Sequence, residues 1–111
     1  MSELPKVKEK DKDKDKGKDT PLVCEKKVVI RNKLGLHARP AALFVQTANR
    51  FQCDIQICKG RQKVNGKSIM GIMTLAIGAG TAMTLRAEGV DAAKAIAELT
   101  KLISSNFGEE E

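Results

Sequence analysis

The residues of this sequence that are best suited to chemistry lie close together between positions 35 and 40. His37, the only histidine, stands where a glycine-containing loop should give way to a helix. Pro40 suits the first turn of that helix, because the N–H that proline lacks would have no intrahelical acceptor there. The free N–H groups and the positive dipole end of a helix start form an anion site. Arg39 adds a guanidinium whose forked donors fit phosphate oxygens.

This arrangement favours phosphoryl transfer. The positive end of a helix disfavours a charged imidazole, so we expect His37 to be neutral and nucleophilic. A neutral imidazole beside an anion site can accept a phosphoryl group, which the helix N–H groups then stabilise. The segment offers no carboxylate as a base and no Ser-His-Asp pattern, which disfavours a hydrolase. The residues alone leave one alternative open, a histidine that only caps the helix.

The elements that must position His37 follow from the periodicity of apolar residues. Alternation predicts strands, and apolar positions three and four apart predict helices. The pattern predicts, in chain order, a strand over 26–31, a helix over 40–49, strands over 53–59 and 61–64, a short helix over 69–75 capped by Ser68, a strand over 81–87 and a last helix capped by Asp91. The order β-α-β-β-α-β-α indicates an α+β fold, a four-stranded, mainly antiparallel sheet with three helices on one face.

The first 24 residues differ in composition from the rest. Seven Lys and six Asp or Glu crowd this segment, so we expect 1–24 to be a disordered charged tail and 25–111 to form one domain. The domain carries thirteen Lys or Arg against eight Asp or Glu, which fits acidic proteins, phosphate or nucleic acid. Three Phe with no Trp or Tyr disfavour stacking-based binding of single-stranded nucleic acid, and no recognition motif for nucleic acid is present.

The cysteines and apolar runs narrow the class further. Three Cys without a secretory signal argue against a disulfide framework. One His and the lack of a CxxC pair argue against a metal site. No apolar run approaches the roughly 20 residues of a membrane helix. We therefore expect a cytoplasmic protein that inserts into no membrane and needs no cofactor.

Two motifs resemble one known family. Residues 35–41, Gly-Leu-His-Ala-Arg-Pro-Ala, resemble the active-site signature of HPr, the histidine-containing phosphocarrier of the bacterial phosphoenolpyruvate-dependent phosphotransferase system. Residues 67–73, Lys-Ser-Ile-Met-Gly-Ile-Met, resemble the family's second signature, around a regulatory serine, at the family's separation without gaps. The resemblance covers about residues 26–106, and the predicted order of elements is the family's order. It implies the HPr-like open-faced β-sandwich.

The resemblance implies a role for each matching residue. His37 would take a phosphoryl group on Nδ1 from enzyme I and pass it to an EIIA-type domain, with Arg39 as the active-site arginine. The N–H groups of Ala38 and Arg39 would bind the phosphate. Ser68 would be phosphorylated by HPr kinase/phosphorylase. The protein would then be a covalent intermediate of a relay and not an enzyme, and we expect a monomer.

Helix geometry and the resemblance together predict a docking surface for partner proteins. It would comprise Ala42 and Leu43 on the first helix and Ile69, Met70 and Met73 on the short helix, with Ile72 in the core. From the residues alone, these apolar side chains could equally be core, and Ser68 could be only a cap. The resemblance favours the docking surface and a regulatory serine.

Two departures from the family pattern concern the downstream output. Leu34 stands where many members carry a small polar residue, and the chain continues to an acidic end at 109–111. Both features resemble the nitrogen-related branch of the same relay. The alternative is therefore a nitrogen-branch or purely regulatory paralogue that is not coupled to sugar transport. The presence of His37 argues against a purely regulatory module, which needs no nucleophile.

Overall fold

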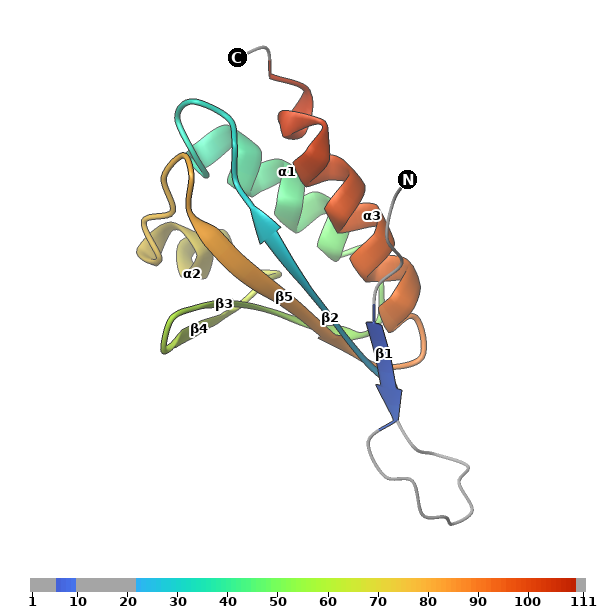
Figure 1. Cartoon of the computed structure of the whole chain (residues 1–111). Helices are drawn as coiled ribbons and strands as arrows, with labels where there is room; N and C mark the ends of the chain where they lie inside the picture. The colour runs from blue at the N-terminus through green and yellow to red at the C-terminus, as the bar shows by residue number, and fades with distance from the viewer. Residues whose placement is uncertain (1–5, 10–21, 110–111) are drawn as a thin grey trace.

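The computed structural model describes residues 6–9 and 22–109. Its sheet is antiparallel, with the strand order β1-β2-β5-β3-β4. Figure 1 shows the sheet with the helices packed on one side. The strands are β1 (Lys6–Glu9), β2 (Leu22–Val29), β3 (Asp54–Lys59), β4 (Gln62–Asn65) and β5 (Ala82–Glu88). β5 is central, because Leu85 lies opposite both Lys26 of β2 and Ile57 of β3.

Three helices cover one face of this sheet: α1 (Ala38–Ala48), α2 (Ile69–Thr74) and α3 (Ala92–Ser104). The core between the layers holds the apolar stripes of α1 and α3 and the inward side chains of the strands, among them Phe44, Ile96, Leu99, Ile57 and Leu85. The predicted α+β architecture of four strands and three helices is confirmed. β1 is an addition, paired only with the outer edge of β2.

The N-terminal boundary of the domain differs from the prediction. β2 begins at Leu22, and Val23 and Cys24 are buried, although both fall in the segment expected to be a disordered tail. Lys6–Glu9 of the same segment form β1. The apolar run 22–24 extends the ladder with β5, and its burial offsets the entropy lost on ordering. The rest of the predicted tail, residues 1–5 and 10–21, lies outside the described residues.

Asp91 occupies the N-cap position of α3, but its carboxylate has other partners. Among the described residues it accepts no hydrogen bond from the start of α3. Its Oδ2 accepts the N–H of Gln52 and its Oδ1 the N–H of Cys53, both at 2.9 Å. The predicted side-chain cap is therefore wrong. The ends of β5 and β3 lie together, since Glu88 is opposite Asp54, and this brings the loop before β3 within reach.

Candidate functional site

The loop that leads into α1 is held by the loop that leads into β5. The N–H of Leu36 donates to the carbonyl of Ile77 at 2.9 Å. Gly35 has a φ of +69°, and a Cβ there would lie 2.4 Å from the oxygen of Ile77. Glycine is therefore required at position 35 for both its conformation and the close approach. These contacts fix the backbone directly before His37.

His37 is the N-cap residue of α1, with an extended backbone. Its carbonyl accepts the first intrahelical hydrogen bond, from the N–H of Ala41 at 3.0 Å. Within the part of the chain that the structure describes, its side chain makes no capping hydrogen bond, so His37 holds the N-cap position through its backbone and not through its ring. The N–H groups of Ala38 and Arg39 precede that first bond and belong to the free donors of a helix start. The predicted phosphate-binding groups thus lie together at one end of α1.

Two residues near the imidazole of His37 were not predicted from the sequence. Glu109 contacts the ring directly, and Asn32 contacts Glu109. Its Nε2 lies 3.1 Å from Oε2 of Glu109, with the two side chains 34% and 21% exposed. Oε1 of Glu109 accepts a hydrogen bond from Nδ2 of Asn32 at 3.0 Å, and the same Nδ2 donates a hydrogen bond to the carbonyl of Gly35 at 2.9 Å. Asn32 is 1% exposed. A buried asparagine thus ties the active loop to a carboxylate near the end of α3.

Ser68 caps α2, as predicted. Its Oγ accepts the N–H of Gly71 at 3.0 Å, and the side chain is half-buried. The neighbouring Lys67 has its Nζ 2.7 Å from the carbonyl of Phe51, to which it donates. The capping role is therefore confirmed, and the regulatory role stays a prediction.

The predicted docking residues lie on two helices that pack together, α1 and α2. Ile72 is fully buried, whereas Ile69, Met73 and above all Met70, at 75%, are exposed. The three exposed side chains are termed the α2 patch. The other two predicted residues, Ala42 and Leu43, are only half-exposed, and Leu43 packs partly against the core. Leu34, 70% exposed in the loop before α1, is a further large apolar side chain on the surface.

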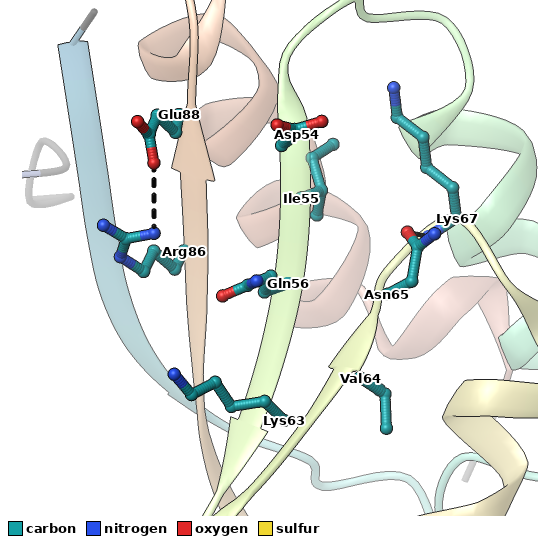
Figure 2. Close-up of a pocket in the computed structure, with 9 residues that line it drawn as sticks. All are labelled: Asp54, Ile55, Gln56, Lys63, Val64, Asn65, Lys67, Arg86 and Glu88. Atoms are coloured by element: carbon teal, nitrogen blue, oxygen red, sulfur yellow. Dashed lines mark hydrogen bonds and ion pairs between the residues drawn. The ribbon is translucent and has the colours of Figure 1, made fainter.

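A hollow of about 360 Å³ lies on the sheet away from His37. Figure 2 shows the side chains that line it, from β3, β4, the loop after β4 and the end of β5: Asp54, Ile55, Gln56, Lys63, Val64, Asn65, Lys67, Arg86 and Glu88. Charges of both signs line the hollow, and Arg86 is paired with Glu88 at 3.4 Å and with Glu25, outside the lining, at 3.3 Å.

Within residues 6–9 and 22–109, no three or more His, Cys, Asp or Glu side chains are grouped so as to hold a metal ion. No helix in the described part of the chain combines the length and apolar character needed to cross a bilayer.

Comparison with known proteins decides the family. A family model described as "PTS HPr component phosphorylation site" matches residues 24–105. The chain belongs to the HPr family. It is 47% identical over 87 residues to phosphocarrier protein HPr of Neisseria meningitidis, covering 78% of this chain and 98% of that protein. It is also 56% identical over 79 residues to the HPr-like protein Crh of Halalkalibacterium halodurans, covering 71% and 94%. HPr proteins are phosphocarriers and not catalysts.

Solved HPr structures share this fold. HPr-C-His from Thermoanaerobacter tengcongensis superposes with a TM-score of 0.77 at 55% identity, covering 78% of this chain and 98% of that one. HPr from Bacillus anthracis gives 0.70 at 53% identity, covering 73% and 96%. Two further relatives are described as dimers, HPr from T. tengcongensis and a swapped form of Crh from Bacillus subtilis. These dimers do not fit the expectation of a monomer.

Proposed function

We propose that this HPr protein carries a phosphoryl group on His37. It accepts the group from enzyme I on Nδ1 and passes it to an EIIA-type domain of a phosphotransferase system in the cytoplasm. The observation that carries this proposal is the placement of His37, a partly exposed imidazole at the start of α1 that does not cap its own helix within the described structure. A histidine in that position is accessible to a phosphorylated donor protein and lies beside the free N–H groups of the helix.

The transfer step uses groups that lie within three consecutive residues. The lone pair of Nδ1 forms a bond to phosphorus while the bond from phosphorus to the donor atom breaks, and that electron pair leaves with the donor. The N–H groups of Ala38 and Arg39 and the guanidinium of Arg39 stabilise the oxygens of the bound phosphoryl group. Passage to the acceptor reverses the same bond changes.

Docking and regulation involve the neighbouring helix. The α2 patch, together with Ala42 and Leu43, supplies apolar contact area, and the exposed Arg39 and Lys33 supply positive charge for an acidic partner. Phosphorylation of Ser68 by a kinase of the HPr kinase/phosphorylase type would place about two negative charges on this surface. The dipole at the start of α2 accommodates that charge, so the fold survives while docking weakens.

The test is incubation of the purified protein with phosphoenolpyruvate and enzyme I. Wild type should incorporate acid-labile phosphate on His37 and lose it again when an EIIA domain is added. His37→Ala should fold normally, because the ring is at the surface, and should incorporate none. Acid-labile phosphate in His37→Ala, or none in wild type, would contradict the proposal.

A second candidate is a regulatory paralogue that acts through Ser68 alone. It is suggested by the 56% identity to an HPr-like protein Crh, a value matched by the 55% identity to HPr from Thermoanaerobacter tengcongensis. Such a protein would take phosphate on Ser68 from ATP and a kinase and none on His37. A nitrogen-branch carrier would instead be phosphorylated on His37 and would transfer to a nitrogen-type EIIA in preference to a sugar-type one.

A further inference from the structure

A turn after α3 brings the chain back to His37. The three residues of η1 (Asn106–Gly108) have positive φ values of 56°, 57° and 77°. Positive φ costs an asparagine or a phenylalanine about 1 kcal/mol or more. Phe107 is nonetheless 4% exposed and belongs to the core, so its burial offsets that cost. The turn lies beyond residue 105, where the match to the family model ends.

The hydrogen bonds of Asn32 show which atom of its amide faces Glu109. The same amide atom contacts both the carbonyl of Gly35 and the carboxylate of Glu109. Both of these groups only accept hydrogen bonds, so the atom must be Nδ2, with one proton for each. The two acceptors at Nδ2 fix this orientation, in which the buried Oδ1 of Asn32 has no hydrogen-bond partner among the described residues. Oε1 of Glu109 therefore accepts a hydrogen bond from Nδ2 of Asn32, an atom that can only donate.

The other oxygen of Glu109 then fixes the proton of the imidazole. A carboxylate accepts only, so at the 3.1 Å contact Nε2 of His37 must be the donor. We propose that Glu109 is a positioning residue that holds His37 in the tautomer with its proton on Nε2, so that Nδ1 presents a lone pair. This inference rests on His37 being the phosphoryl acceptor.

The same contact favours the transfer step itself. When Nδ1 bonds to phosphorus, positive charge develops on the ring while Nε2 keeps its proton. The carboxylate of Glu109 faces that proton and stabilises the charge, as an acidic residue does behind a catalytic imidazole. Glu109 does not touch the transferred group, so its effect on transfer acts through the ring of His37.

Glu109→Gln is the most informative variant, because the two sides of the new amide are not equivalent. Asn32 can only donate to it, so the amide oxygen must turn toward Asn32. The NH₂ group of the new side chain then faces Nε2 of His37, which must accept. The proton of the ring moves to Nδ1, and the lone pair is on the wrong nitrogen.

Glu109→Ala separates this effect from a loss of packing. Without a partner at Nε2 the ring is free to adopt either tautomer, so alanine should be less harmful than glutamine. A structural role would give the opposite order, because alanine removes more contacts. Glu98→Gln, on the half-buried flank of α3, is the control for the loss of one glutamate charge.

The experiment has two readouts on the full chain. Nitrogen-15 NMR of His37 in alkaline buffer, where imidazole side chains are uncharged, reports the tautomer without any phosphoryl transfer. We expect the proton on Nε2 in wild type and Glu98→Gln, on Nδ1 in Glu109→Gln, and divided between them in Glu109→Ala. The initial rate of phosphorylation by enzyme I should fall on the order of 10- to 100-fold in Glu109→Gln, the range known for loss of the groups that orient metal-ligating histidines, and less in Glu109→Ala.

The two readouts distinguish failure of this inference from failure of the proposed function. Normal phosphorylation in all variants, with the proton on Nε2 throughout, would overturn the role of Glu109 and leave the phosphocarrier intact. A slower rate in alanine than in glutamine would also overturn it. The predicted change of tautomer without phosphorylation of any variant would support the positioning role and contradict the proposed function.

Discussion

Oδ1 of Asp91 accepts the backbone N–H of Cys53 at 2.9 Å, across 38 residues of sequence. The contact joins the start of α3 to the loop before β3. Burial acts to raise the pKa of Asp91, but the hydrogen bonds from Gln52 and Cys53 outweigh it and lower that pKa below its ordinary value. Burial, reinforced by the Asp91 carboxylate, raises the pKa of the Cys53 thiol to about 12.

Asp91→Asn should lower the free energy of unfolding at neutral pH and matter less in acid. A carboxyl whose pKa is lowered on folding stabilises the protein above its unfolded pKa, and that stabilisation is lost as the pH falls through the folded value. The difference between wild type and variant should therefore shrink below about pH 4. Urea unfolding at a series of pH values measures it, with Asp54→Asn as the control for loss of an exposed carboxylate. A difference that is constant with pH would contradict this assignment.

The three cysteines should react differently with iodoacetamide in the native protein. Cys24 and Cys53 are buried, and burial raises the pKa of both thiols, so neither presents an accessible thiolate. Cys58 is half-exposed. Mass spectrometry should find one adduct, at Cys58, in the native state and three in urea. Native labelling of Cys53 would show that the loop before β3 opens readily.

Removal of residues 1–24 should destabilise the protein more than removal of 1–21. The longer deletion takes away Val23 and Cys24, which are buried and pair with Glu88 and Ala87 of β5. We expect an additional loss of about 2–4 kcal/mol, from the burial of these two side chains. Urea unfolding of the two deletion variants measures the difference. Equal stability would mean that β2 effectively begins after Cys24.

Negative charge at Ser68 should slow phosphorylation of His37 by enzyme I while leaving the fold intact. Ser68→Asp keeps a capping side chain and adds one charge to a basic surface, which weakens attraction to an acidic partner. Ser68→Ala should transfer normally, at a stability cost of about 1 kcal/mol for the lost cap. The measurement is the initial rate of phosphorylation at low and high salt.

The Ser68→Asp defect should shrink as salt rises, since the Debye length falls from about 10 Å at 0.1 M to about 3 Å at 1 M. Ala93→Glu adds the same charge in the first turn of α3, on an exposed position, and is the matched control. Equal rates for the aspartate and alanine variants of Ser68 at low salt would leave Ser68 as a cap only.

Local patterns were sufficient to predict the three helices and the strands β2 to β5, but not β1. The apolar stripe expected over 40–49 corresponds to α1 at Ala38–Ala48, and the cap expected at Ser68 is formed by its own hydroxyl. These features depend on spacings of a few residues, which a single sequence displays. The start of β2 was predicted too late. Leu22 and Val23 follow a run of Lys and Asp, and the composition of that run led to their assignment to the tail.

Contacts between distant residues could not be predicted in the same way. Asp91 has a residue type typical of an N-cap, and nothing in its neighbourhood indicates that two N–H groups of another loop would compete for it. Glu109 is 72 residues from His37 and follows a turn with a buried phenylalanine at positive φ, a conformation that sequence does not signal. The motif thus sufficed to propose His37 as the phosphoryl acceptor, whereas its contact with the carboxylate of Glu109 required the structure.

Because α2 is short, the proposed phosphorylation site at Ser68 and the proposed docking surface of the α2 patch lie close together. The six residues of α2 span about 9 Å at 1.5 Å per residue and carry the α2 patch, and Ser68 directly precedes them. Under the proposed function, a partner docked on Ile69, Met70 and Met73 would lie next to the Ser68 hydroxyl. That partner and a kinase would then compete for this surface, and Ser68 would be modified mainly in molecules with no partner bound. The fraction of the protein that has no partner bound would then limit the fraction that can be phosphorylated on Ser68.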